Sequence, residues 1–129
     1  MSEVVDVIMA SNMMRAGGSA SEEKIGAAEE TLGLKFATDY KEYLRSFGFI
    51  SYEGHELTGI SESQRLNVVS VTQEAREIYI NINPELYVIE DTGYEGILIL
   101  QNQKGEVFQI EPHSDPQKVC DSLADYIAR

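Results

Sequence analysis

The side chains best suited to chemistry are two adjacent carboxylates, Glu90 and Asp91, with an aromatic ring, Tyr94, shortly after them. A glycosidase uses two acids of this kind, provided that they face one another across a cleft. A small carboxylate-dependent hydrolase that uses Glu90 or Asp91 is therefore one hypothesis for this chain. It requires a concave pocket that brings two acids within catalytic reach and raises the pKa of one of them.

The other nucleophiles and metal ligands form no recognisable site. Cys120 falls on an apolar stripe, where a thiol acts as a small hydrophobic side chain. His55 and His113 are far apart in the chain and lack zinc-ligand spacing. Ser114 and Asp115 follow His113 directly, whereas a catalytic triad is assembled by the fold. We therefore expect no catalytic residue, no metal and no cofactor.

Acidity is the most informative bulk property of the chain. Its 129 residues include 22 Asp or Glu and 10 Lys or Arg, which gives a net charge of −12. Such a surface repels nucleic acids and anionic lipids and attracts basic proteins. Residues 85–115 hold seven acids and one base, Lys104, so half of the net charge lies in this segment.

Length and composition predict one domain over residues 1–129. The single cysteine excludes a disulfide framework within the chain and is typical of a reducing compartment. The first residues carry acids where a signal peptide needs bases, and no apolar run approaches the length of a membrane span. We expect a cytoplasmic protein that binds neither membranes nor nucleic acid. The sequence does not indicate an oligomeric state.

Apolar periodicity predicts helices over residues 3–14, 20–32, 38–47 and 72–81, and a fifth in the C-terminal segment from residue 114. Serines at 19, 70 and 114 begin capping-box patterns, and Thr38 is the expected N-cap of the third helix. Gly33 supplies the stop of the second helix. The segment 78–82 would also suit a strand.

The third predicted helix has an aromatic face. Tyr40, Tyr43, Leu44 and Phe47 recur at helical spacing, whereas the charged side chains between them fall elsewhere on the helix. This spacing predicts that the four side chains face the core. The helix is therefore interpreted as scaffold.

Short β-branched and aromatic runs predict strands over residues 85–91, 96–101 and 106–111. The turn signals between them indicate an antiparallel meander. Residues 49–70 are interpreted as a loop with one or two short strands, near 56–59 and 66–69. The predicted fold class is α+β, with a central antiparallel sheet flanked by N-terminal helices and a C-terminal helix.

The stretch LGLKFATDYKEYLRSFG and the residues around it resemble the Smi/Knr-type domain of the SUKH superfamily. The matching residues are Ile25, Glu29, Leu32, Gly33, Leu34, Phe36, Asp39, Tyr40, Lys41, Tyr43, Leu44 and Gly48. Two departures stand out: Ala37 occupies a position where the family usually has proline, and Phe47-Gly48-Phe49 replaces a common Asn-Gly pair. The resemblance extends from about residue 19 to the C-terminal helix.

The resemblance implies an α+β domain without enzymatic activity. Bacterial members are largely immunity proteins, which bind and neutralise a polymorphic or contact-delivered toxin, often a nuclease; a regulatory or scaffold role is the alternative. An acidic surface suits a basic toxin, because complementary charge accelerates association. The expected partner-binding residues lie in the loops 50–65 and 90–96: Tyr52, Glu53, Glu56, Glu90, Asp91, Tyr94 and Glu95.

Overall fold

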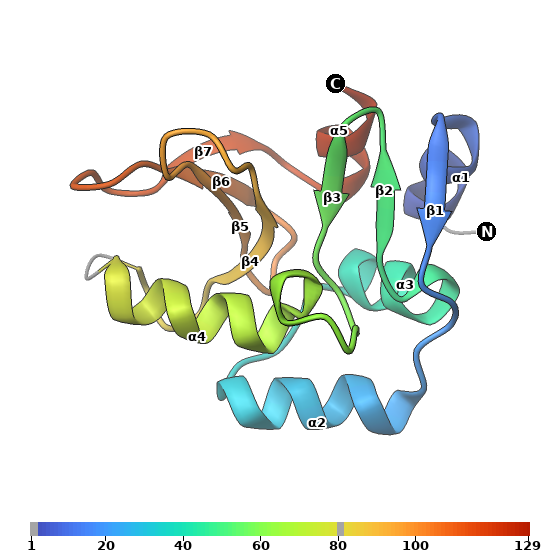
Figure 1. The fold of residues 1–129 in the computed structure, drawn as a ribbon, viewed down its shortest axis with the longest axis horizontal. Coiled ribbons are helices and arrows are strands. Elements are labelled where there is room, and N and C mark those ends of the chain that lie inside the picture. The colour runs from blue at the N-terminus through green and yellow to red at the C-terminus, as the bar shows by residue number, and fades with distance from the viewer. Residues whose placement is uncertain (1–2, 80–81) are drawn as a thin grey trace.

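The computed structural model describes residues 3–79 and 82–129 (Figure 1). The helices are α1 (Glu3–Ala10), α2 (Glu22–Leu32), α3 (Thr38–Phe47), α4 (Val68–Ile78) and α5 (Leu123–Ala128), with a 3-10 turn, η1 (Gln64–Leu66). The strands are β1 (Met13–Ala16), β2 (Ile50–Tyr52), β3 (His55–Leu57), β4 (Tyr87–Asp91), β5 (Leu98–Gln101), β6 (Val107–Ile110) and β7 (Gln117–Cys120). Together they confirm the predicted α+β class.

The strands form one seven-stranded sheet in the order of the chain, with every neighbouring pair antiparallel. The predicted meander is confirmed as β4, β5 and β6, and it continues at both ends. The β3–β4 pairing is the shortest, with the single register pair Leu57↔Glu90. The sheet bends at this joint, so that β1–β3 and β4–β7 point in different directions (Figure 1).

Both faces of the central strands are buried, each in its own core. The larger core takes Tyr87 and Ile89 from β4 and Ile99 from β5, together with side chains of α1, α2, α3 and α5. The smaller core takes Val88 and Leu100 from the opposite face and is covered by α4. Burial on two faces explains why these strands read as continuous apolar runs rather than as an alternating pattern.

The aromatic face of α3 is buried as predicted. The hydroxyl groups of its two tyrosines form hydrogen bonds inside the core. Tyr43 Oη donates to the carbonyl oxygen of Thr58 at 2.7 Å, and Tyr40 Oη lies 3.0 Å from Thr58 Oγ1. Thr58 Oγ1 also donates to the carbonyl oxygen of Val88 at 2.8 Å. One threonine on the segment after β3 therefore joins α3 to β4.

Replacement of this threonine tests the network. Thr58→Val keeps the shape but removes the donor to Val88, and a buried carbonyl left unsatisfied costs about 1–3 kcal/mol. We expect urea denaturation to show a loss of this size in the free energy of unfolding. Thr31→Val, the same change on the exposed face of α2, should shift it by less than about 0.5 kcal/mol. Equal effects of the two variants would contradict the proposed network.

Two predicted helices extend over residues that form edge strands. The helix expected over 3–14 ends at Ala10, where Ser11 Oγ donates to the carbonyl oxygen of Ile8 at 2.6 Å, and β1 follows. The C-terminal helix expected from 114 begins only at Leu123, because residues 117–120 pair with β6 as β7. In both cases pairing with a distant strand overrides a local apolar pattern.

The segment between β3 and α4 also differs from expectation. The strand near 56–59 corresponds to β3, but the strand near 66–69 is wrong: Leu66 ends η1 and Val68 begins α4. Asn67 caps α4, since its side chain accepts from the amides of Val69 and Ser70. The helix predicted for 72–81 therefore begins earlier than expected, and its residues 80–81 lie outside the described part of the chain.

The N-caps of α2 and α3 are displaced from the predicted positions. Ser21 caps α2 in place of Ser19, and its hydroxyl accepts from the Lys24 amide at 3.2 Å. Ala37 precedes α3 in place of Thr38, without a side-chain cap. Gly33 ends α2 as predicted, with φ of 69° in the left-handed region that glycine tolerates.

Candidate partner-binding surface

Alternate turns of an antiparallel meander fall on the same side of the sheet, and three turns do so here, with the β2–β3 turn set apart from the other two by the bend at the β3–β4 joint (Figure 1). They connect β2 to β3, β4 to β5 and β6 to β7 (Figure 1). Their exposed acids are Glu53, Glu95, Glu111 and Asp115, with Asp91 at the end of β4. Residues 53–54, 92–97 and 111–116 contain no Lys or Arg. We call this set of turns the acidic end.

Backbone strain singles out the same three turns. The described non-glycine residues with positive φ are Glu53 at 44°, Glu95 at 52° and His113 at 67°, one in each turn. The left-handed region costs an L-residue other than glycine about 1 kcal/mol or more. A tight hairpin turn requires positive φ at its central residues, and Glu53–Gly54 and Glu95–Gly96 both have it, so the strain serves the turns of the sheet.

Relief of this strain should stabilise the protein. Glu95→Gly places glycine at a positive φ, so we expect the free energy of unfolding to rise by about 0.5–1 kcal/mol. Glu30→Gly is the matched control on the exposed surface of α2, where glycine costs a helix about 1 kcal/mol. The two variants should therefore move the urea midpoint in opposite directions. A lower midpoint for Glu95→Gly would show that its backbone is not strained.

Behind the turns lies a buried carboxylate, Glu90, with its side chain 4% exposed. His55 Nδ1 lies 2.9 Å from Glu90 Oε2, and Tyr126 Oη donates to Glu90 Oε1 at 2.5 Å. Tyr52 stacks on His55 with ring centroids 5.0 Å apart. This cluster joins β2, β3, β4 and α5, and it presents the half-exposed imidazole of His55 at the surface.

A β-bulge in β4 turns Glu90 toward this cluster. The register passes from Val88↔Leu100 to Glu90↔Ile99, so Ile89 and Glu90 together face one residue of β5. Regular alternation would place Glu90 on the face of Val88, toward α4. The bulge instead directs it to the side of Tyr126, while Asp91 lines a hollow beside Tyr79 and Leu98.

Burial and the nearby carboxylates change the acidity of the two tyrosines in the cluster. Burial is the largest cause that raises the pKa of Tyr52 and of Tyr126, and the charge of Glu90 raises both further. Both phenols therefore stay protonated at neutral pH. Tyr126 consequently serves as a constant donor to Glu90.

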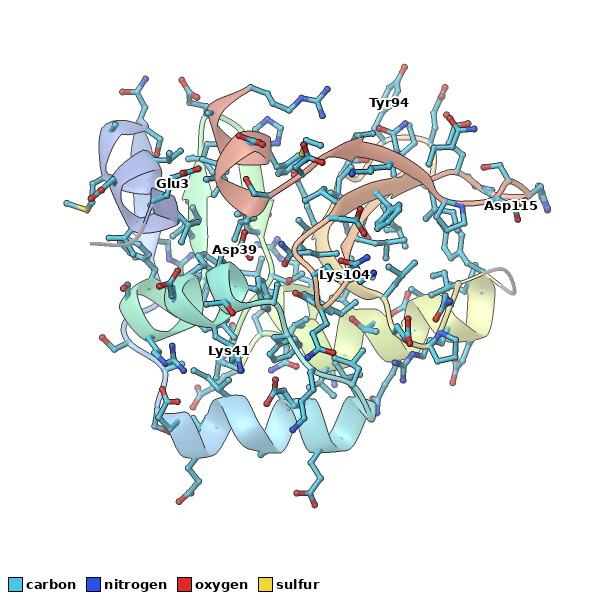
Figure 2. All side chains as sticks on the ribbon, turned by 180° about the vertical axis from the view of Figure 1, so that it is seen from behind. Glu3, Asp39, Lys41, Tyr94, Lys104 and Asp115 are labelled. Carbon is cyan, nitrogen blue, oxygen red and sulfur yellow. The ribbon has the colours of Figure 1, made fainter. Side chains whose placement is uncertain are left out.

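The structure brings some of the predicted partner-binding residues together and separates others. Glu53, Asp91, Tyr94 and Glu95 are exposed at the acidic end, with Tyr94 at 65% exposure. In Figure 2 Tyr94 lies at the top of the molecule, away from α2, and Asp115 lies at its right-hand edge. These side chains form the accessible part of the predicted site.

Three predicted residues have other surroundings. Tyr52 and Glu90 are buried, so they can act on a partner only through His55, which they position. Glu56 points toward η1, where Arg65 binds it with two hydrogen bonds that lower the pKa of Glu56. Its charge is therefore already paired within the chain.

Glu111, Asp115 and His55 are members of the surface that the sequence did not reveal. The turn at 111–116 reads locally as the start of a helix, which hides its place beside the other turns. His55 reads as a solvated loop residue next to an acid. The turn before β7 could have been placed beside the others from the alternation of turns along an antiparallel meander. That inference requires residues 117–120 to be recognised as a strand.

The geometry of Glu90 and Asp91 argues against the hydrolase hypothesis. Glu90 faces Tyr126 and Asp91 faces the α4 side, so the two carboxylates do not converge on one bond. Cys120 lies in β7 rather than on a helix, and burial raises the pKa of its thiol. A reactive thiolate needs the opposite shift.

The residues of the SUKH resemblance prove to hold the scaffold together. Glu29 accepts from the Phe36 amide at 2.8 Å, which fixes the link between α2 and α3. Asp39 accepts from the Leu123 amide at 2.9 Å and from Gln101 Nε2 at 3.0 Å. Burial raises the pKa of Asp39, and these hydrogen bonds oppose the rise. Asp39 therefore ties α3 to β5 and α5.

An antiparallel meander covered by helices, with its aromatic α3 buried and one end of the sheet acidic, defines a small α+β domain. The family model described as SMI1-KNR4 cell-wall, SUKH_5, matches residues 1–129, and the chain therefore belongs to the SUKH family. No curated protein matches the chain. In the described part of the chain, no helix is long and apolar enough to cross a membrane.

Proposed function

We propose that this protein is an immunity protein, which binds a basic protein toxin at its acidic end and neutralises it. The observation that carries the proposal is the concentration of exposed acids in three turns that contain no Lys or Arg. Membership of the SUKH family supports the same role. A nuclease is one toxin class that fits, because its substrate-binding cleft must be basic.

The roles within the surface follow from exposure. Glu53, Asp91, Glu95, Glu111 and Asp115 supply charge that steers a basic partner toward the turns. Tyr94 supplies the aromatic anchor, since most of its ring is available for burial. Tyr52 and Glu90 hold the His55 side chain in place by ring stacking and by a hydrogen bond, which supports the β2–β3 hairpin.

Co-expression with the protein encoded by the neighbouring gene tests the proposal. If that neighbour is a toxin with a basic domain, the two proteins should purify together, and this chain should restore growth of cells that express the toxin. Tyr94→Ala should weaken the complex by at least about tenfold without altering the fold, because the ring is exposed. Failure to bind the neighbouring toxin would reject the proposal, and binding unaffected by Tyr94→Ala would reject this surface.

A further inference from the structure

A small hollow lies between α4 and the β4–β5 hairpin, next to the acidic end. Its volume is about 330 Å³, at the lower limit of the roughly 300–1,000 Å³ that ligand pockets occupy. Asp91 lines the hollow and also belongs to the acidic end, so the two surfaces are continuous. A protein seated on the β4–β5 turn could therefore extend one side chain into the hollow.

The walls of the hollow are mainly apolar, and part of that apolar surface is open to solvent. Val71, Ala75 and Ile78 line it from α4, where they are neighbours on one helix face. Leu98 lines it from β5. Ile78 is 63% exposed, although its side chain is large and aliphatic. This wall can therefore bury the methylene stem of a long side chain.

The ring of Tyr79 completes the wall close to Asp91. The Tyr79 hydroxyl donates to the carbonyl oxygen of Gly96, which holds the ring against the β4–β5 turn. Burial raises the pKa of Tyr79, and the charge of nearby Asp91 raises it further. A flat cation that stacks on this ring would therefore also lie near the carboxylate.

Two carboxylates in the lining have no internal counter-charge. Glu74 on α4 and Asp91 at the end of β4 are exposed, and neither has a base within ion-pair distance among the described residues. Asp91 Oδ1 accepts from the Gly93 amide at 2.9 Å, which fixes the carboxylate. The one base in the described lining, Arg65, is held by two hydrogen bonds to Glu56. The hollow therefore attracts a cation.

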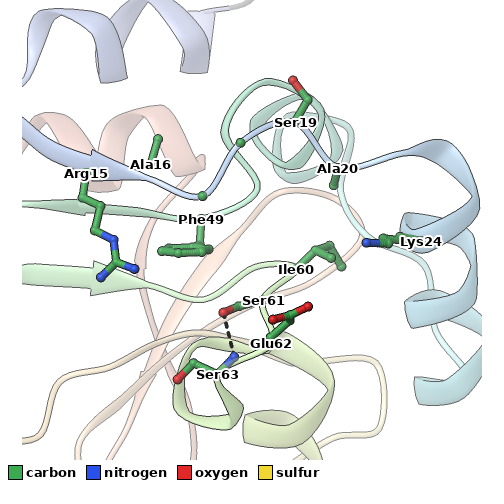
Figure 3. Close-up of a pocket in the computed structure, with 12 residues that line it drawn as sticks. Arg15, Ala16, Ser19, Ala20, Lys24, Phe49, Ile60, Ser61, Glu62 and Ser63 are labelled. Carbon is green, nitrogen blue, oxygen red and sulfur yellow. Dashed lines mark hydrogen bonds between the residues drawn. The ribbon is translucent and has the colours of Figure 1, made fainter.

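Three other hollows lack this combination. Figure 3 shows a larger cleft that has two bases, Arg15 and Lys24, and a single acid, Glu62. A second hollow, at the α2–α3 link and the β5–β6 turn, also has two bases and one acid. A third, beside β7, has two acids, but its one apolar lining residue is Val119. Of these four hollows, only the one beside α4 joins an apolar wall and an aromatic ring to a surplus of acids.

We propose that this hollow binds one arginine side chain of the partner protein. The guanidinium would stack on the Tyr79 ring and donate to Asp91, while its methylene groups would lie along Ile78. Lysine fits less well, because its compact, strongly hydrated ammonium lacks the planar face that stacks on a ring. The inference rests on the proposed function, since the toxin is the protein that would supply the arginine.

Titration of the intact protein with acetyl-Gly-Arg-Gly-amide, followed by amide NMR, tests the hollow without the toxin. We expect shifts at Ala75, Ile78, Tyr79 and Gly96, and an affinity that falls as salt is added. The peptide with citrulline in place of arginine keeps the shape without the charge, and it should bind about fivefold more weakly. Equal binding of the citrulline or the lysine peptide, or shifts spread evenly over all the acidic turns, would overturn the proposal.

Matched variants locate the binding energy. Asp91→Asn keeps the acceptor for Gly93 but removes the charge, so we expect about threefold weaker binding of the arginine peptide. Ile78→Ser removes the exposed apolar wall and should weaken binding by about threefold as well. Glu77→Gln removes an equal charge from the exposed surface of α4 outside the lining, and it should leave the affinity unchanged. Equal losses for Asp91→Asn and Glu77→Gln would show a general charge effect and would reject the hollow.

The toxin complex separates the failure of this inference from the failure of the proposed function. If the toxin binds and Asp91→Asn and Ile78→Ser weaken its complex as they weaken the peptide, the inference is supported. If the toxin binds but neither variant affects the complex, the inference is wrong and the proposed function stands. If no toxin binds, the proposed function is wrong, and the peptide titration alone decides whether the hollow recognises arginine.

Discussion

Gly59→Ala is expected to lower the free energy of unfolding by about 3 kcal/mol or more. The Cβ of alanine would lie 1.7 Å from the carbonyl oxygen of Gly48, and the main chain cannot move aside. Gly59 donates to the Leu66 carbonyl and accepts from the Val68 amide, both at 2.8 Å. A clash with the carbonyl group of a hydrogen-bonded main chain is among the largest effects of a single substitution.

Gly26→Ala is the control for this result. Gly26 lies within α2, and its Cβ position has no neighbour within 4 Å. Alanine is the better helix former, so this variant should gain up to about 1 kcal/mol. Chemical denaturation followed by circular dichroism measures both. A Gly59→Ala protein as stable as the parent would show that the crossing of residues 48 and 59 is looser than described.

Charge reversal at the acidic end is the second large effect that we expect. Glu53→Lys combined with Glu95→Lys should weaken binding of a basic toxin by about 100-fold, since like charges would then face one another across the interface. Lysine keeps the same backbone strain as glutamate, so stability should change little. Association rates from surface plasmon resonance at several salt concentrations would show the loss mainly as slower association.

The matched control reverses the same number of charges elsewhere. Glu23 and Glu30 are exposed on α2, which lies away from the acidic turns (Figure 1). Glu23→Lys with Glu30→Lys changes the net charge equally and should leave toxin binding within about threefold of the parent. If both pairs of substitutions weaken binding alike, attraction is due to total charge, and the acidic end is not the binding surface.

The parts of the fold that could be predicted are those where the sequence pattern is local and repeated. Tyr40, Tyr43, Leu44 and Phe47 recur at helical spacing and occupy the core as expected. The edge strands β1 and β7 could not be predicted in this way, because their pairing is decided by β2 and β6. The same short apolar runs would suit a helix if those partners were absent.

The candidate site was harder to predict than the fold. Tyr94 and Glu95 were recognisable as exposed, since turn residues surround them. The burial of Glu90 depends on a one-residue bulge, and no feature of the letters YVIED indicates where the register shifts. The position of Asp115 depends on β7. Because the sequence predicted a helix from residue 114 instead of this strand, Asp115 was not recognised as part of the acidic end.

The narrow joint between β3 and β4 has a thermodynamic consequence. The two parts of the sheet meet at one register pair, Leu57↔Glu90, reinforced by the contact of His55 with Glu90. A partner that touches both the β2–β3 turn and the β4–β5 turn would span this joint. A partner that binds only when the joint is formed would raise the free energy needed to open the joint. Recognition and the integrity of the domain are thereby linked through the same few residues.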